Sequence, residues 1–361
     1  MTETDKKIYM KKAIELAQHG EGFVNPNPLV GSIIVKNGKI IGEGYHAQFG
    51  GPHAEVNAFN NATEDVTDAT MFVTLEPCAH YGKTPPCALK IIEKKIKKVI
   101  IAKTDPNPLV HMKGIELLKN AGIEVEYGLL SDEVELQNEI FLKYIQTKLP
   151  FVSIKYAMTA DGKLATKKMD SKWITNEASR AYVHELRNRH MAIMVGVNTI
   201  IHDDARLNTR LDKPHRNPIR IIIDPDLDIP RDAYVVKTAQ VQPTWVVTKK
   251  YEQRLVDLGV RIIQMPDIDL VALMKKLGEE KVDSVLIEGG SYTHGKALES
   301  GIVDKVYVFI APKLVGGKQA LTPVGSEGVD LMSDAYQLKH VKYTPFGDDI
   351  LMEGTIIKEK I

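Results

Sequence analysis

The spacing of apolar residues predicts alternating helices and strands in the first part of the chain. Apolar residues recur at helical spacing over residues 4–19, and Gly20 then ends the pattern. Asn37 and Gly38 lie between two β-branched runs, which is typical of a hairpin. Further helices are expected over 53–62, 85–94, 111–122 and 131–146, and strands over 29–35, 40–45, 69–75, 98–102 and 123–128. This order predicts helices packed on a mostly parallel sheet.

The pattern breaks at "QTKLP", residues 146–150, and a second alternating series follows. Since 361 residues exceed what one core usually serves, we expect one domain over 1–147 and another over 150–361. Strands are predicted over 151–159, 192–197, 219–224, 244–248, 260–265, 282–290 and 305–317, and helices over 176–190, 251–258, 268–278 and 291–299. Both domains are therefore expected to be α/β.

Composition and charge narrow the range of partners. Apolar residues make up 43% of the chain and charged residues 26%, as in ordinary globular proteins. Lys plus Arg equals Asp plus Glu at 47 each, so we expect no nucleic-acid partner. No apolar run approaches the roughly 18 residues that span a bilayer, and the N-terminus lacks a signal-peptide pattern. We therefore expect a cytoplasmic protein without a membrane partner.

Two short segments contain the residues with the clearest chemistry. "HAEVNA" holds His53 and Glu55, and "EPCAHYGKTPPC" holds Cys78 and Cys87, the only cysteines in the chain. In a reducing compartment, such cysteines favour metal binding or catalysis over a disulfide. One histidine and two thiolates leave the fourth position of tetrahedral zinc for water, as in catalytic sites. Glu55 would then be free to move protons, a combination typical of zinc nucleobase deaminases.

Other interpretations of these residues remain open. A lone histidine at a helix start is usually a cap, and a lone cysteine is usually a small buried hydrophobe. The joint pattern favours catalytic zinc, whereas a structural zinc would need a fourth protein ligand. Glu76, two residues before Cys78, is a second candidate carboxylate, but its position at a strand end favours a structural role.

Motifs along nearly the whole chain resemble the bifunctional riboflavin-biosynthesis family, in which a pyrimidine deaminase is joined to a reductase. They are "NPNPLVG", "HAEV", "TLEPCAHYGKTPPC", "DPNPLV", "DGK", "SKWIT", "EGG" and "APKLVGG". The eight residues between the cysteines, where most deaminases have two, match that family. The resemblance implies a cytidine-deaminase-like α/β/α domain followed by a dihydrofolate-reductase-like α/β domain. It also implies hydrolytic deamination of a phosphoribosyl diaminopyrimidinone and NADPH-dependent reduction of its ribosyl group. Separately, we expect a small-molecule substrate and a homo-oligomer.

The resemblance also implies roles for individual positions. In the deaminase half, His53, Cys78 and Cys87 would hold Zn²⁺, and Glu55 would be the acid/base. The implied substrate contacts there are Asn27, His46, His80, Lys83, Asp105 and Asn107. In the reductase half, the implied substrate contacts are Lys155, Ser171, Thr175, Arg187, Leu207, Arg210 and Glu288. The implied NADPH contacts are Ala157, Trp173, Thr199, Asp203, Gly289, Gly290 and Ser291.

The second domain offers fewer signals of its own. The turn from Glu288 to Ser291 lies between a strand and a helix and can present backbone N–H groups to a phosphate. No G-x-G-x-x-G follows a strand, so a Rossmann site is not expected. Lys155 is a hypothetical catalytic group that polarises the sugar carbonyl. Ala205 and Pro225 depart from the family pattern, which often has a proline and a small hydroxyl residue there. The alternative is a deaminase for another base with an unrelated oxidoreductase domain.

Overall fold

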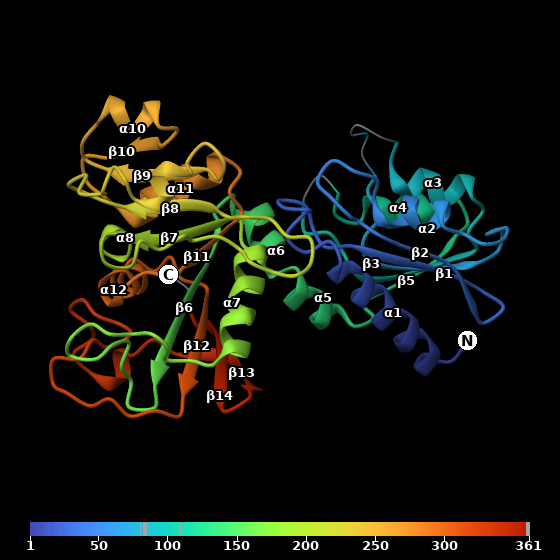
Figure 1. Cartoon of the computed structure of the whole chain (residues 1–361). Helices are drawn as coiled ribbons and strands as arrows, with labels where there is room; N and C mark the ends of the chain where they lie inside the picture. Colours follow the sequence, from blue (N-terminus) through green and yellow to red (C-terminus); the bar gives the residue numbers. More distant parts are fainter. Residues whose placement is uncertain (80, 82–84, 108–109, 359–361) are drawn as a thin grey trace. The chain divides into compact units, whose positions relative to one another are not determined.

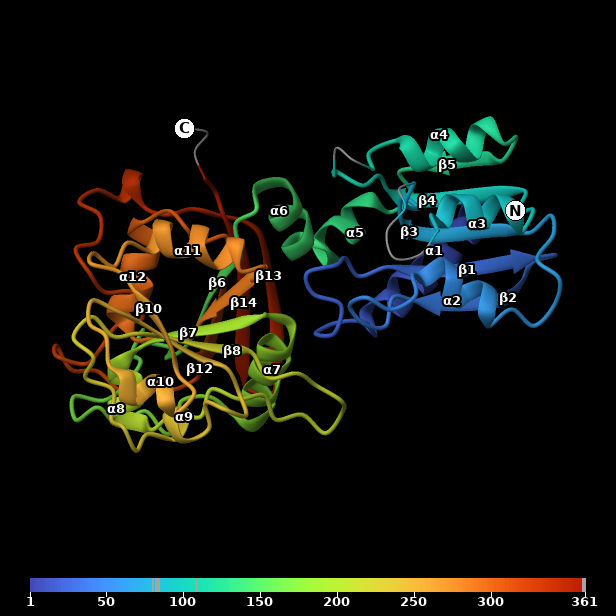
Figure 2. The same cartoon turned by 90° about the horizontal axis from the view of Figure 1, so that it is seen from above.

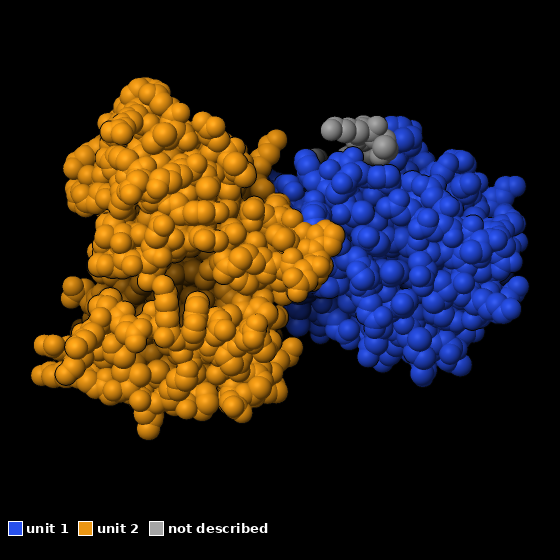
Figure 3. All heavy atoms as spheres, in the orientation of Figure 1, with its two compact units in different colours: residues 1–148 blue, residues 149–361 orange. Residues whose placement is uncertain are grey.

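The computed structural model describes residues 1–79, 81, 85–107 and 110–358. The chain forms two compact units, Met1–Lys148 and Leu149–Ile361, which Figure 3 draws in different colours. Among the described residues, none of the helices combines the length and the apolar character needed to cross a bilayer. The α/β class predicted for both halves is confirmed (Figure 1).

The first unit is built on a five-stranded sheet in the order β2-β1-β3-β4-β5. The strands are β1 (Gly31–Lys36), β2 (Lys39–Tyr45), β3 (Thr70–Leu75), β4 (Lys98–Lys103) and β5 (Glu124–Tyr127). β1 pairs antiparallel with both β2 and β3, whereas β3, β4 and β5 run parallel. The predicted hairpin is confirmed, because Asn37 and Gly38 both have positive φ between Lys36 and Lys39, which pair with each other.

Helices cover both faces of this sheet (Figure 1). They are α1 (Glu3–Gln18), α2 (Ala54–Asn60), α3 (Cys87–Glu93), α4 (Lys113–Asn120), α5 (Ser131–Gln137) and α6 (Glu139–Thr147). Ile34, Met71 and Ile101 pack under α2, α3 and α4. Their strand neighbours point the other way, toward α1 and α5, because successive residues of a strand face opposite sides. The sheet thus forms the middle of an α/β/α sandwich.

The single helix predicted over residues 131–146 is wrong, because the chain breaks into α5 and α6 at Asn138. This residue has φ −103° and ψ 18° and is only 2% exposed. Its side-chain Oδ1 accepts a hydrogen bond from Leu29 N at 2.8 Å, and its Nδ2 donates to Leu29 O at 3.0 Å. A buried side-chain amide that pairs with a distant backbone segment favours the break over a continuous helix. The loop before β1, which carries Asn27, is fixed in this way.

The second unit contains a nine-stranded sheet in the order β10-β9-β8-β7-β11-β6-β12-β14-β13. The strands are β6 (Phe151–Thr159), β7 (Ala192–Gly196), β8 (Ile219–Ile223), β9 (Thr244–Thr248), β10 (Arg261–Gln264), β11 (Ser284–Ile287), β12 (Lys305–Ala311), β13 (Leu338–Phe346) and β14 (Asp349–Ile356). All neighbours from β10 to β12 pair in parallel, and β14 and β13 add an antiparallel edge. The carboxyl ends of seven strands therefore lie at one edge of the sheet.

Helices also cover both faces of the second sheet (Figure 2). They are α7 (Glu177–Arg189), α8 (Val197–Asp203), α9 (Tyr234–Lys237), α10 (Gln253–Asp257), α11 (Leu270–Glu279) and α12 (Ser291–Glu299), with a 3₁₀ turn at Met332–Asp334. α11 and α12 pack on the face formed by Val285 and Ile287, and α7 packs on the opposite face. The predicted strand over 305–317 was too long, since β12 ends at Ala311.

Candidate functional site

The three candidate zinc ligands lie where strand ends meet helix starts in the first unit. His53 is the residue before the first turn of α2. Cys78 follows the end of β3, and Cys87 is the first residue of α3, after Pro86. In open α/β sheets, loops at the carboxyl ends of parallel strands commonly form ligand sites. The fold therefore brings together residues that are up to 34 positions apart in sequence.

The geometry of this cluster fits a tetrahedral metal. His53 Nδ1 lies 3.2 Å from Cys87 Sγ and 3.6 Å from Cys78 Sγ, and all three ligand atoms lie within 4.8 Å of one another. Tetrahedral zinc with ordinary bond lengths places its nitrogen and sulfur ligands about 3.6 Å apart, and its two sulfurs about 3.8 Å apart. The chemistry and the spacing of the three donors thus match zinc. Among the described residues, no fourth His, Cys, Asp or Glu joins the cluster.

The surroundings favour a thiolate at Cys78. Hydrogen bonds from the Cys87 thiol, from His53 and from the Cys87 backbone N–H together outweigh burial and lower the pKa of Cys78. The backbone N–H of Cys87 donates to Cys78 Sγ at 3.2 Å. The pKa of Cys87 is raised, because it shares a proton with Cys78 and is buried. The interaction with Cys78 raises the pKa of His53. A thiolate is the form that zinc binds.

Glu55 lies in the first turn of α2, two residues after His53, and is only 3% exposed. Burial raises its pKa to about 7, and the negative charge of Cys78 adds to this effect. A carboxyl group with such a pKa can both accept and release a proton near neutrality. The structure thus places a proton-transfer group beside the three ligand atoms.

Asn27 and His46 form a hydrogen-bonded pair beside the cluster. His46 Nδ1 lies 3.0 Å from Pro52 O, and its Nε2 lies 3.2 Å from Asn27 Nδ2. Since a carbonyl can only accept, Nδ1 carries the hydrogen and Nε2 accepts from the Asn27 amide. Burial lowers the pKa of His46, which favours this neutral form. The His46 and His53 rings meet edge to face at 5.6 Å, so both residues belong to the same site.

Glu76 anchors the segment that carries Asp105 and Asn107. Its carboxylate accepts hydrogen bonds from the backbone N–H groups of Asp105 at 3.2 Å, Met112 at 3.1 Å and Gly114 at 3.0 Å. Asp105 in turn accepts from Asn107 N at 2.8 Å. A Cβ on Gly114 would lie 2.0 Å from Pro77 O, so this close approach requires glycine. The structural role expected for Glu76 fits these contacts. His80 and Lys83 lie outside the described residues.

The second unit has an ion-pair cluster at the ends of its central strands. Glu288 directly follows β11, and Lys155 lies on the neighbouring β6. Lys155 Nζ lies 3.2 Å from Glu288 Oε2, and Arg187 from α7 contacts both oxygens of Glu288, at 2.7 and 3.0 Å. Burial raises the pKa of Glu288, but the charges and hydrogen bonds of Arg187 and Lys155 lower it to about 2. Glu288 is therefore ionised at neutral pH.

Asn208 connects this cluster to Arg210, a contact that the sequence did not suggest. Arg187 donates to Asn208 O at 2.9 Å, and Arg210 donates to Asn208 Oδ1 at 2.6 Å. Leu207 is buried with φ 52°, and its carbonyl accepts from Gln242. Burial and the charge of Arg187 lower the pKa of Arg210. Two guanidinium groups are thus held close together.

The other predicted reductase residues lie on the loops and strand ends of the same unit. Ser171, Trp173 and Thr175 belong to the segment between β6 and α7, where Arg180 stacks on Trp173 at 4.6 Å and donates to Thr175 O. The remaining positions are Ala157 on β6, Thr199 and Asp203 on α8, Gly289 and Gly290 in the turn before α12, and Ser291 at its start. No contact places Ser171, Trp173 or Thr175 against Lys155 among the described residues.

Comparisons with known proteins cover both units. The RibD C-terminal domain family matches residues 150–352, and the cytidine and deoxycytidylate deaminase zinc-binding region matches residues 3–103. The riboflavin biosynthesis protein RibD of Actinobacillus pleuropneumoniae is 48% identical over 99% of this chain and 96% of its own length. The protein of the same name from Escherichia coli is 38% identical over 96% and 98%.

Solved structures of related proteins also match nearly the whole length of this chain. RibD of Acinetobacter baumannii, form 1, has a TM-score of 0.90 at 36% identity and covers 99% of this chain and 100% of its own. A diaminohydroxyphosphoribosylaminopyrimidine deaminase/5-amino-6-(5-phosphoribosylamino)uracil reductase of Thermotoga maritima has a TM-score of 0.89 at 38% identity, covering 98% and 99%. Since relatives of this identity match nearly end to end, the chain belongs to the RibD family, bifunctional enzymes of riboflavin biosynthesis that combine a zinc-dependent deaminase with an NADPH-dependent reductase.

Proposed function

We propose that this chain catalyses two consecutive reactions on one small molecule. The first is hydrolytic deamination of 2,5-diamino-6-ribosylamino-4(3H)-pyrimidinone 5′-phosphate, in a domain over residues 1–147. The second is NADPH-dependent reduction of the ribosyl side chain to ribityl, in a domain over residues 150–361. Support comes from the similarity to the Thermotoga maritima protein, whose name contains both activities, and from the separate residue clusters in the two units.

In the deaminase, we propose that His53, Cys78 and Cys87 hold zinc. Two thiolates and one imidazole match the ligand set of catalytic zinc, which leaves one position open. When bound, zinc lowers the pKa of a coordinated water, so that a nucleophile is available near neutral pH. The three ligand atoms within 4.8 Å of one another are the single observation that carries this proposal.

Glu55 then transfers the proton. Its carboxylate takes a proton from the attacking water, and the resulting acid delivers it to the departing amine, which leaves as ammonia. A pKa of about 7, caused mainly by burial, suits both directions of transfer. Water supplies the oxygen that replaces the amine, so the step needs no oxidant or reductant.

The deaminase substrate would contact Asn27, His46, Asp105 and Asn107, and also His80 and Lys83. The pairing with His46 uses the Asn27 amide nitrogen and leaves its oxygen available to a donor on the pyrimidine ring. Asp105 and Asn107 are held by hydrogen bonds at the end of β4, the strand beside β3. A lysine at position 83 would suit the 5′-phosphate.

In the reductase, we propose that Lys155 is the catalytic group. NADPH supplies the hydrogen and its two electrons when it is bound. Lys155 Nζ would donate a proton to the ring oxygen as its bond to C1′ breaks, C1′ would accept the hydride, and Glu288 would hold the ammonium in place. Arg187 and Arg210 would face the substrate phosphate, since a guanidinium can chelate two phosphate oxygens. Ser171, Thr175 and Leu207 would complete the substrate contacts.

The cofactor would lie along the strand ends of the second unit. Gly289 and Gly290 precede α12, whose first turn has no side-chain cap, so its backbone N–H groups can meet the diphosphate. The other proposed contacts are Ala157, Trp173, Thr199, Asp203 and Ser291.

We also propose that the enzyme is cytoplasmic and a homo-oligomer. β13 is an edge strand of the nine-stranded sheet, and two of its side chains are exposed: Val341 is 41% exposed and Tyr343 is 64% exposed. An exposed edge strand leaves backbone N–H and C=O groups available for pairing with a second copy. Sedimentation of the purified chain would test this directly, because a monomer at micromolar concentration would contradict it.

Assays of both reactions with one purified chain test this proposal. Ammonia release from the diaminopyrimidinone phosphate should precede NADPH oxidation, which requires the deaminated product. Deamination of cytidine, or of a base in RNA, in place of this substrate would instead favour the alternative of an unrelated appended reductase. Failure to oxidise NADPH with either pyrimidine would contradict the second step alone.

A further inference from the structure

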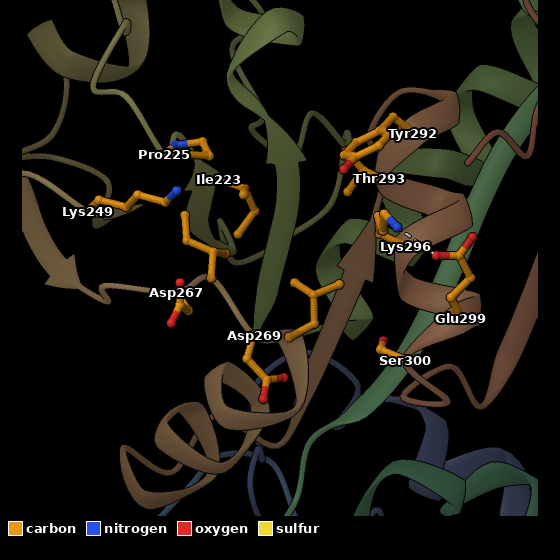
Figure 4. Close-up of a pocket in the computed structure, with 12 residues that line it drawn as sticks. Ile223, Pro225, Lys249, Asp267, Asp269, Tyr292, Thr293, Lys296, Glu299 and Ser300 are labelled. Carbon is orange, nitrogen blue, oxygen red and sulfur yellow. Dashed lines mark hydrogen bonds and ion pairs between the residues drawn. The ribbon is translucent and has the colours of Figure 1, made fainter. Parts of the chain in front are cut away.

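A cavity of about 570 Å³ lies in the second unit at the carboxyl ends of β8 and β9 (Figure 4). Pro225 follows β8 and Lys249 follows β9 on one side, and Tyr292 and Thr293 from α12 form the other side. This volume is within the range of pockets that hold nucleotide-sized ligands. The site thus lies where parallel α/β sheets commonly bind ligands.

The cavity continues from the glycine turn that precedes α12. Tyr292 and Thr293 directly follow Ser291, and a Cβ on Gly289 would lie 2.9 Å from Thr293 Cβ. In the sheet, β7 and β8 lie between β11 and β9. β11 leads to Glu288, and β9 leads to Lys249. Three strand spacings amount to about 14 Å. A dinucleotide with its reacting ring near Lys155 and its diphosphate at the glycine turn would therefore place its adenosine half in this cavity.

Two lysines border the cavity, and only one is committed to a partner. Lys296 Nζ contacts Glu299 at 2.8 Å and lies over the Tyr292 ring at 5.7 Å. Lys249 Nζ has no hydrogen bond or ion pair with any of the described residues. Figure 4 shows its ammonium group beside Pro225 and Ile223, directed toward the cavity. Lys249 is therefore the cation at this site that is available to an anionic ligand.

Three carboxylates also line the cavity, and one of them, Glu299, is paired with Lys296. Asp269 caps α11 and accepts from Val271 N at 2.7 Å and Ala272 N at 3.4 Å. Asp267 is exposed at the rim and offsets part of the positive field. Recognition of an anion here consequently depends on direct contact with the Lys249 ammonium rather than on long-range attraction. Pro225 cannot assist, because it has no N–H and no polar side-chain atom.

We propose that Lys249 binds the 2′-phosphate of the NADPH adenosine and determines the preference of this enzyme for NADPH over NADH. This inference rests on the proposed reductase function and adds its specificity residue. The two cofactors differ only at that phosphate. A charge-assisted hydrogen bond from an otherwise uncommitted ammonium favours the phosphorylated form. Tyr292, 67% exposed at the same cavity, offers its ring face to the adenine.

Binding of adenosine fragments to the full chain tests the proposal. Calorimetry would compare 2′,5′-ADP with 5′-AMP on the wild type, on Lys249→Ala and on Lys249→Arg. We expect Lys249→Ala to weaken 2′,5′-ADP binding roughly tenfold to a hundredfold, the loss typical of a hydrogen bond to a charged group. Binding of 5′-AMP serves as the internal check that the cavity is folded. Lys249→Arg should recover most of the affinity.

The neighbouring Lys250 provides the matched control, since its Nζ bonds Asp226 O at 2.7 Å and it does not line the cavity. Lys250→Ala should bind both fragments as the wild type does. In steady-state assays, the NADPH-to-NADH ratio of kcat/KM should fall about tenfold or more in Lys249→Ala. Equal 2′,5′-ADP affinity in wild type and Lys249→Ala would overturn the role of Lys249. A wild-type chain that oxidises neither cofactor would instead contradict the proposed reductase function.

Discussion

Glu55 and Glu288 are both buried carboxylates, but their pKa values shift in opposite directions. Burial raises the pKa of Glu55 to about 7, whereas the nearby Arg187 and Lys155 overcome burial and lower that of Glu288 to about 2. Near neutral pH, the first group can exchange a proton and the second remains charged. The same side-chain chemistry thus suits proton transfer in one unit and the positioning of cations in the other.

His190 makes the stability of the second unit sensitive to acid. Burial lowers its pKa from 6.5 to about 3, and its ring is held between Leu186 O at 2.8 Å and Ser153 Oγ at 2.9 Å. Between these two pKa values, the unfolded chain binds a proton that the folded chain does not. We therefore expect the free energy of unfolding to fall as pH decreases below about 6.5, by up to roughly 1.4 kcal/mol per pH unit.

Denaturant unfolding from pH 7 to pH 4 measures this effect. The only two tryptophans, Trp173 and Trp245, both lie in the second unit, so their fluorescence reports on that unit alone. His190→Gln should flatten the dependence on pH, whatever it does to stability at pH 7. The same change at the exposed His202 is the control. An unchanged pH slope in His190→Gln would refute this role.

The residues of the metal cluster could be predicted from sequence, whereas their supports could not. His53, Cys78 and Cys87 have a spacing and chemistry that few other functions share. The three N–H groups that converge on Glu76 come from a segment 29 to 38 residues further along the chain, and nothing local indicates them. Asn208 is a similar case, because its role follows only from the folded positions of the two arginines.

At the scale of elements, close packing of α2 on β2 places His53 and Glu55. A Cβ on Gly42 would lie 2.5 Å from Ala58 O, and one on Gly44 would lie 2.2 Å from Ala58 N. Both glycines face the helix, so its backbone approaches the strand more closely than any side chain would allow. The position of the two site residues thus depends on glycines that have no chemistry of their own.

Gly44→Ala should therefore move α2 and damage the deaminase selectively. We expect a loss of about 1–3 kcal/mol in the stability of the first unit, typical of overpacking, and a reduced zinc content. Metal analysis and far-UV circular dichroism in denaturant provide the measurements. Glu43→Ala, on the same strand, is the matched control. A Gly44→Ala protein with full zinc content and wild-type deamination would contradict this account.

Elements with strong local patterns were predicted well, and those shaped by tertiary contacts were not. The hairpin at Asn37 and Gly38 follows from turn chemistry, and the predicted helices that bury an apolar face were found. The helix break at Asn138 depends on pairing with the distant Leu29. The β13–β14 hairpin was not predicted, because β13 is largely exposed and lacks an apolar run.

At the scale of the whole molecule, the two activities lie in separate units with separate cores. Glu55→Gln should lower deamination about a thousandfold, the loss expected for a general acid–base group, and leave zinc and the reduction of deaminated substrate intact. Lys155→Met should have the opposite effect, lowering reduction and not deamination. Each reaction is assayed with its own substrate, so that the loss of deamination and the loss of reduction are measured separately. Loss of both activities in either variant would contradict independent sites.

The most direct test of the central claim is zinc K-edge X-ray absorption combined with metal analysis of the purified full chain. We expect one zinc per chain, bound by two sulfurs at about 2.3 Å and by one imidazole nitrogen, with a lighter ligand in the fourth position. Cys87→Ser should remove one sulfur from this shell or release the metal. A chain that holds no zinc, or a zinc without two sulfur neighbours, would contradict the assignment of His53, Cys78 and Cys87.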